Sequence, residues 1–195
     1  MLFPRTALTA AVSFTCAVGP LSAQQQPGGI WITGGIGAGL TRVHCEICQG
    51  DRKIGPSVQL GIGLRLNQKL ALGGEASGWR KKEKEEDITS SAGTLLAVIY
   101  WYPAPDKVRY FLKGGIGAIA YKAKANEDEE ADPFTFNTFG VQLGVGYQFR
   151  ISRDFTLSPY FTFMGSLSSD LEQGDDRVPD VSLTWIQLGI AIGWR

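Results

Sequence analysis

Residues 139–149 alternate without a break between large apolar side chains and small or polar ones. In an extended strand one side of this segment carries only bulky apolar residues, namely Phe139, Val141, Leu143, Val145, Tyr147 and Phe149. The other side carries only glycine and glutamine, because side chains alternate faces with period 2. A soluble sandwich would bury the bulky side in a core. A membrane barrel turns it toward lipid and places glycines in its crowded interior.

The same alternation recurs in seven further segments, at 30–40, 57–66, 70–80, 89–102, 110–120, 157–164 and 187–194. Segment 70–80 alternates more weakly than the others. Segment 89–102 is apolar on both sides, so its outward side stays undecided. Eight is an even number and the smallest that closes a bacterial barrel. The pattern therefore predicts an all-β fold, a closed eight-stranded antiparallel up-and-down transmembrane β-barrel.

The connections between these segments alternate in length and charge. Three are short, at 67–69, 103–107 and 151–154, as tight hairpins require. Four are longer, at 43–53, 81–88, 122–133 and 168–180, and they hold 16 of the 19 acidic residues. A soluble barrel would spread its charges along the outward strand faces, which meet water. Charges gathered at one end and an uncharged waist favour a barrel embedded in lipid.

The N-terminus has the pattern of a secretory signal peptide. Arg5 precedes an apolar run at 7–18, and the small residue Ala23 precedes three glutamines. We expect residues 1–23 to be removed, which leaves a single barrel domain at 24–195. That domain has 18 basic and 19 acidic residues, since Arg5 is lost from the total of 19 each. A net charge of −1 argues against a nucleic-acid partner.

Aromatic residues gather at the strand ends beside the short turns. Rings with a polar handle favour the bilayer interface. These residues are predicted to form an interfacial girdle, the alternative being ordinary core aromatics: Tyr100, Trp101, Tyr102, Tyr110, Tyr147, Phe149 and Trp194.

Two cysteines, Cys45 and Cys48, remain in the mature chain, both in the first long connection. A close pair in an oxidising compartment favours a local disulfide. A metal or redox site is an alternative, although only His44 is an obvious further ligand and zinc prefers four. Free thiols are the third possibility. The sequence predicts no metal and no cofactor.

Three charged residues, Arg65, Glu75 and Lys113, fall on the sparse, inward side of their strands. A narrow eight-stranded barrel is filled by side chains, so charges inside it must pair. We expect a structural charge network, with Arg65 and Glu75 in direct or bridged contact from neighbouring strands. An ion path is the alternative. The acidic runs at 127–132 and 170–180 are expected to be solvated loops, with divalent-cation binding as the alternative.

Several motifs resemble those of a known family. They are Tyr102-Pro103 leading into Lys113-Gly114-Gly115-Ile116-Gly117, the run Leu157-Ser158-Pro159-Tyr160, and the alternating C-terminal strand. On these residues the mature chain resembles the small outer-membrane β-barrels of diderm bacteria, of the OmpA/OmpX eight-stranded type. The resemblance implies insertion in the cell outer membrane, with both termini in the periplasm. It also implies contact with outer-membrane lipid and with the barrel-assembly machinery, which reads a terminal aromatic residue. Here that aromatic is Trp194, followed by Arg195.

Such folds host several functions, so the role must come from the residues. We expect a structural or surface-interaction scaffold that acts through four long extracellular loops, with an extracellular partner that the sequence does not identify. The alternatives are a narrow, porin-like channel for ions or small solutes, and a soluble lipocalin-like ligand-binding barrel. We expect no enzymatic activity, because His44 is the sole histidine and there is no Gly-x-Ser-x-Gly elbow.

Overall fold

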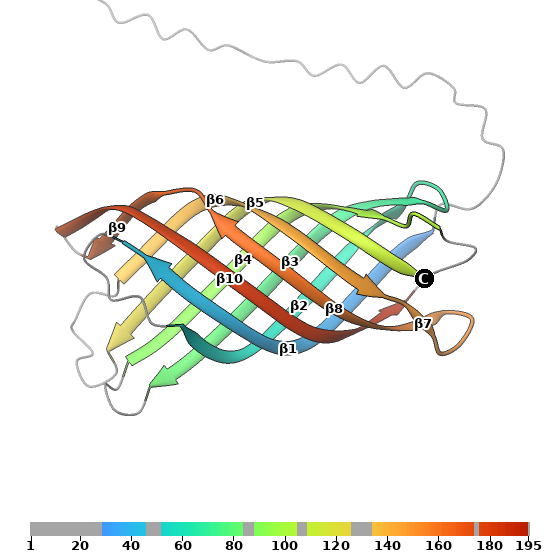
Figure 1. The fold of residues 1–195 in the computed structure, drawn as a ribbon, viewed down its shortest axis with the longest axis horizontal. Coiled ribbons are helices and arrows are strands. Elements are labelled where there is room, and N and C mark those ends of the chain that lie inside the picture. Colours follow the sequence, from blue (N-terminus) through green and yellow to red (C-terminus); the bar gives the residue numbers. More distant parts are fainter. Residues whose placement is uncertain are drawn as a thin grey trace, which may run out of the picture.

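The computed structural model describes residues 29–45, 52–83, 88–104, 109–125, 134–173 and 176–194 as a barrel of β-strands (Figure 1). The predicted signal peptide lies outside these residues. No helix in the described ranges is long and apolar enough to cross a membrane. The strands are β1 (Ile30–His44), β2 (Lys53–Arg65), β3 (Leu70–Glu83), β4 (Ile88–Trp101), β5 (Tyr110–Ala125), β6 (Phe134–Tyr147), β7 (Phe149–Arg150), β8 (Phe155–Ser166), β9 (Ser169–Gln173) and β10 (Asp176–Trp194).

Each long strand pairs antiparallel with the next one along the chain, and β10 returns to pair with β1. The closing register runs without a shift from Ile32 opposite Trp194 to His44 opposite Ser182. The two short strands extend longer ones, since β7 follows β6 after one residue and β9 follows β8 after two. The predicted closed eight-stranded up-and-down barrel is confirmed. Closure leaves no free edge strand, as a barrel in lipid requires.

The two ends of the barrel differ. The turn end holds Gly29, the strand ends at Arg65, Leu70, Trp101, Tyr110, Arg150 and Phe155, and Trp194. The loop end holds the strand ends at His44, Lys53, Glu83, Ile88, Ala125, Phe134, Gln173 and Asp176. In Figure 1 the turn end lies at the right, near the C-terminus and β7, and the loop end lies at the left, near β9.

The bulky apolar rows face outward all around the barrel, as the alternation predicts. Outward side chains such as Leu60, Ile116, Leu143 and Leu188 are among the most exposed large apolar residues. The structure also decides which side of β4 faces outward, because Leu95 is 68% exposed and its neighbour Leu96 is only 2% exposed. The odd-numbered residues of β4 therefore face outward. An apolar exterior of this extent rules out the lipocalin-like alternative, whose exterior would be polar.

The strands continue further into the loop end than the sequence indicates. Residues 168–180, predicted as a loop, contain β9 and the start of β10, which pair with each other through Gln173 opposite Asp176. A register shift between Val178 and Val181 accompanies Asp180, whose φ of 55° is a left-handed conformation that aspartate tolerates. Beyond the lipid neither face of a strand needs to be apolar, so alternation stops marking the strand although the backbone ladder continues.

Candidate functional site

Buried side chains fill the lumen in three layers. The layer nearest the loop end is apolar and consists of Trp79, Ala92, Ile119, Tyr121, Phe136, Met164, Val181, Leu183 and Trp185. The layer nearest the turn end is also apolar and largely aromatic, and it consists of Ala71, Leu96, Val98, Tyr100, Tyr102, Phe111, Tyr160 and Ala191. Along the strands, the buried polar residues Glu75, Lys113 and Gln187 lie between these two groups. On β10, for example, Gln187 lies between Trp185 and Ala191.

An ion pair between Glu75 on β3 and Lys113 on β5 lies at the centre of the polar layer. Lys113 Nζ is 2.8 Å from Glu75 Oε1 and 3.0 Å from Glu75 Oε2. Both side chains are only 1% exposed. Burying two charges is costly unless further hydrogen bonds satisfy the remaining lone pairs and protons.

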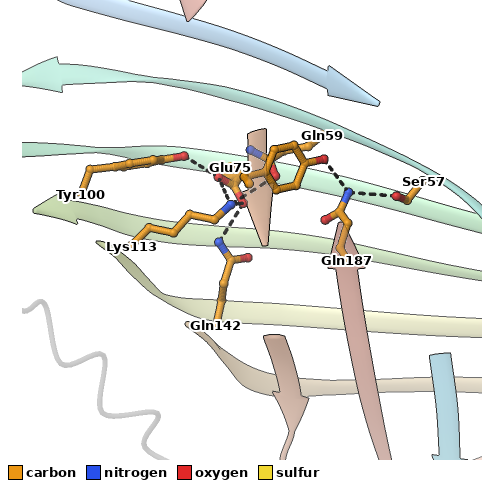
Figure 2. Close-up of polar contacts among 8 residues, drawn as sticks. Ser57, Gln59, Glu75, Tyr100, Lys113, Gln142 and Gln187 are labelled. Carbon is orange, nitrogen blue, oxygen red and sulfur yellow. Dashed lines mark hydrogen bonds and ion pairs between the residues drawn. The ribbon is translucent and has the colours of Figure 1, made fainter. Parts of the chain in front are cut away.

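Three neighbours supply those hydrogen bonds (Figure 2). Tyr100 donates from its hydroxyl to Glu75 Oε2 at 2.7 Å, and Gln142 Nε2 donates to Glu75 Oε1 at 2.8 Å. Lys113 Nζ also donates to Gln59 Oε1 at 3.1 Å. Both carboxylate oxygens are therefore engaged twice. This arrangement holds strands together across the lumen and leaves the Glu75 carboxylate no vacant position for a passing ion.

A second set of contacts extends the polar layer to β8 and β10. Gln187 Nε2 donates to Ser57 Oγ at 3.1 Å and to Tyr160 Oη at 3.0 Å. The Tyr160 ring lies 5.3 Å from Lys113 Nζ, which links the two sets. The side-chain oxygens of Gln142 and Gln187 turn toward each other (Figure 2), and neither accepts a hydrogen bond from the described part of the chain. Among the long strands, within their described residues, only β1 contributes no side chain to this network.

Small residues around Tyr160 make room for it. A Cβ atom on Gly189 would lie 2.7 Å from Tyr160 Oη and 2.5 Å from Ile36 O. One on Gly35 would lie 3.1 Å from Tyr160 Cε1. The glycines on the inward faces of β1 and β10 thus allow the tyrosine ring to cross the narrow lumen.

Arg65 does not join the Glu75 network, which contradicts the predicted Arg65–Glu75 contact. Its guanidinium carbon lies 4.7 Å from the centre of the Tyr102 ring, a cation–π contact at the turn end. In the β2–β3 register Arg65 is opposite Ala71, four residues from Glu75, and its side chain contacts Tyr102 at the turn end instead. The described residues contain no hydrogen bond or ion pair between Arg65 and Glu75.

A cavity of about 40 Å³ lies between the Glu75–Lys113 network and the turn end, with Trp31, Arg65, Lys113 and Gln148 among its lining residues. At roughly 10–15 Å³ for each water, it has room for about three water molecules. It is too small for an organic ligand of ordinary size.

The girdle prediction is wrong for two of its residues. Tyr100 and Tyr102 are buried in the lumen, because Trp101 between them faces outward. Four of the remaining residues, Trp101, Tyr147, Phe149 and Trp194, are exposed on the outer wall, and Tyr110 is half-buried. Their contact with the bilayer interface stays a prediction.

Cys45 is disulfide-bonded, and Cys48 lies outside the described residues, so the Cys45–Cys48 pairing stays a prediction. His44 Nε2 is 3.4 Å from Thr184 Oγ1 at the loop end. Within the described ranges no three His, Cys, Asp or Glu side chains gather to hold a metal. The acidic run at 127–132 lies outside the described residues and the run at 170–180 is described only in part, so their cation binding stays a prediction.

Sequence reasoning missed the aromatic layers. Alternation puts Trp79 on the inward side with Glu75, but Phe136 and Trp185, which also fill the loop-end half, lie just outside the predicted segments 139–149 and 187–194. Extending the alternation would have placed both inward, since Phe136 keeps the parity of Gln142 and Trp185 that of Gln187.

Comparison with known proteins places the fold. A family model described as "outer membrane protein beta-barrel domain" matches residues 8–195. Among curated proteins there is no significant sequence match. Neisserial surface protein A superposes with a TM-score of 0.55 at 10% identity, covering 85% of this chain and 96% of that one. Ail, the attachment invasion locus protein of Yersinia pestis, gives 0.55 at 16% identity, covering 87% and 100%. A major outer membrane protein from Thermus thermophilus gives 0.53 at 12% identity, covering 84% and 98%.

Proposed function

Because this chain belongs to the outer membrane protein β-barrel domain family, we propose that it is a closed scaffold that presents its loop-end segments at the cell surface. As a member of this family it is a transmembrane protein of the cell outer membrane. The proposed role as a closed scaffold is supported by the side chains that fill the lumen. Its polar centre is tied across the barrel by the Glu75–Lys113 pair, with apolar layers on either side.

Recognition in this proposal belongs to the loop-end connections, which a rigid barrel holds in place. The names of two structural neighbours, a surface protein and an attachment invasion locus protein, describe surface roles for those proteins. The two neighbours share only 10% and 16% of their residues with this chain. Their names are consistent with a surface role here but identify no partner for this protein.

Planar-bilayer recording tests the closed lumen. We expect the wild-type protein to show no steady conductance after insertion, because ions would have to pass two apolar layers and a satisfied ion pair. The double variant Glu75→Ala/Lys113→Ala, checked for folding by unboiled gel mobility, should show brief openings. Large, steady conductance of the wild type would contradict the proposal.

That same recording evaluates the second candidate, a narrow channel. Its support is the polar centre of the lumen, where the buried oxygens of Gln142 and Gln187 accept no hydrogen bond from the described residues. Steady wild-type conductance that changes its ion selectivity in Gln142→Leu would favour this function over the scaffold.

We further propose that the protein is not an enzyme and that the barrel-assembly machinery reads its last strand through Trp194. His44→Ala should leave any lipid hydrolysis by the purified protein unchanged. Trp194→Ala should lower the amount of folded protein in the outer membrane, whereas Trp101→Ala, at another exposed position of the turn end, should lower it less.

A further inference from the structure

The cavity of about 40 Å³ between the Glu75–Lys113 pair and the turn end is positively charged, and we call it the turn-end cavity. Two cationic side chains, Arg65 and Lys113, line it, and none of its described lining residues is an aspartate or a glutamate. Glu75 is not among them, so the cavity meets the lysine side of the ion pair. Arg65 adds a second positive charge that no carboxylate of the described lining offsets.

Arg65 has hydrogen-bond donors that nothing in the described part of the chain uses. Its guanidinium group carries several N–H donors in a rigid fork. Within the described residues its side chain forms no ion pair and no hydrogen bond, and its charged group lies 4.7 Å from the centre of the Tyr102 ring. An aromatic ring attracts a cation but offers the N–H groups no lone pair. Because Arg65 is half-buried, its donors are also partly withdrawn from water.

Two hydroxyl groups add further donors to the lining. Ser158 on β8 is 6% exposed, and its hydroxyl forms no hydrogen bond within the described ranges. Tyr102 Oη accepts a hydrogen bond from Gln148 Nε2 at 3.1 Å, which leaves its own hydrogen to donate. The lining acceptor Gln59 Oε1 is already engaged by Lys113 Nζ at 3.1 Å. The described lining thus presents donors without acceptors of their own, and such donors bind an anion strongly.

The surface around the turn end is also basic. Among the described residues, Asp154 is the one acidic side chain there. Four exposed basic side chains outnumber it: Lys69, Arg109, Arg150 and Arg153. An excess of positive charge raises the local concentration of anions. Arg65 and Gln148 are only half-buried, so the turn-end cavity can be reached from this side.

A closely packed wall fixes the size of the turn-end cavity. The Trp31 indole lines it and lies against three glycines of β2 and β3, namely Gly61, Gly63 and Gly73. A Cβ atom would lie 3.0 Å from a carbon of the indole ring at Gly61, and 2.8 Å from one at Gly63 and at Gly73. The indole therefore lies directly on the backbone of these strands. Space for about three water molecules admits a monatomic anion with a water but excludes an organic anion of ordinary size.

We propose that the turn-end cavity binds one small inorganic anion of the size of a halide ion. The Arg65 guanidinium group and the hydroxyl groups of Ser158 and Tyr102 donate to it. Lys113 adds its charge, since its three N–H groups are taken by Glu75 and Gln59. The short turns of such barrels lie in the periplasm, so the anion enters from there. The anion site lies at the end opposite the loop-end segments, so it does not depend on the scaffold role.

The line width of the chloride NMR signal tests the site, with the full chain folded in micelles of a zwitterionic detergent. Sodium gluconate keeps the ionic strength constant, because gluconate is too large for the cavity. We expect the wild type to broaden the chloride signal in a saturable way, and Arg65→Gln to weaken the fitted affinity at least tenfold. The matched control Arg150→Gln removes an exposed arginine of the turn end that does not line the cavity, and it should stay within twofold of the wild type.

A second variant separates the cavity from the charge of Arg65. Ser158→Val removes a donor and fills part of the cavity, so it should weaken chloride binding at least threefold although Arg65 is kept. It also provides the answer should Arg65→Gln not fold, as checked by unboiled gel mobility. Unsaturable broadening by the wild type, or unchanged affinity in either cavity variant, would overturn the proposal. An equal loss of affinity in Arg150→Gln would do so too, because it would assign chloride to the basic surface.

Discussion

Glu75 illustrates what a single buried charge requires of the residues around it. Its carboxylate accepts hydrogen bonds from Lys113, Tyr100 and Gln142, which come from three different strands. The inward position of Glu75 and Lys113 was predictable from alternation. Their contact was not, because Lys113 is opposite Tyr100 and Tyr100 is opposite Ala71, four residues from Glu75. Only the length of the lysine side chain and the curvature of the closed barrel bring the two charges together.

Removing one partner of this pair should destabilise the barrel more than removing both. Lys113→Met leaves a buried carboxylate without its cation, which we expect to lower the free energy of unfolding by about 3–5 kcal/mol. Glu75→Gln/Lys113→Met leaves no unpaired charge and should cost less than Lys113→Met alone, and therefore less than the sum of the two single changes. Urea unfolding in lipid vesicles measures all three variants.

The control for this cycle is Lys69→Met, whose exposed side chain should change the free energy of unfolding by no more than about 0.5 kcal/mol. Additive effects of Glu75→Gln and Lys113→Met would show that the two side chains do not interact.

Gly189 is predicted to be intolerant of even one methyl group. Gly189→Ala would bring a Cβ atom to 2.7 Å from Tyr160 Oη, and relieving this overlap should cost about 1–3 kcal/mol. The matched control is Gly34→Ala, where the nearest atom, Leu60 Cδ2, is 3.5 Å away. Thermal unfolding in detergent compares them. Equal midpoints for the two variants would show that Tyr160 is not packed against Gly189.

At the scale of the strands, alternation identifies an element only where one face meets lipid. It placed β6 and β8 correctly because their outward rows are uniformly bulky. It left β4 undecided because Leu96 and Val98 fill the lumen with the same residue types that Leu95 and Ile99 present outside. It missed β9 because that strand pairs at the loop end, beyond the apolar rows.

Two isoleucines with nearly the same exposure allow the position of the hydrocarbon layer to be measured. Ile116 on β5 is 63% exposed at mid-height, and Ile54 on β2 is 62% exposed at the loop end. Ile116→Lys should cost about 2–4 kcal/mol because it places a charge near the bilayer midplane, whereas Ile54→Lys should cost about 0–1 kcal/mol. Urea unfolding in vesicles gives both values. A larger cost at Ile54 than at Ile116 would place the membrane at a different height on the barrel.

At the scale of the whole molecule, an apolar exterior and a filled interior arise from one pattern. The outward rows are apolar because they contact lipid, and the inward rows combine glycines with a few large side chains because the cylinder is narrow. Membership of the family and the outer-membrane location were predictable from that pattern. The layering of the lumen depends on the register between neighbouring strands, which the sequence alone does not show.

The contact of outward side chains with lipid is tested most directly by nuclear Overhauser effects between methyl groups and acyl chains. Leu95 and Leu96 are adjacent in β4 and provide a comparison within one wild-type sample of methyl-labelled protein in lipid nanodiscs. We predict strong cross-relaxation between acyl-chain methylenes and the Leu95 methyls, and none to the Leu96 methyls. Equal cross-relaxation to both leucines, or cross-relaxation confined to Leu96, would contradict the assignment of the apolar rows to lipid.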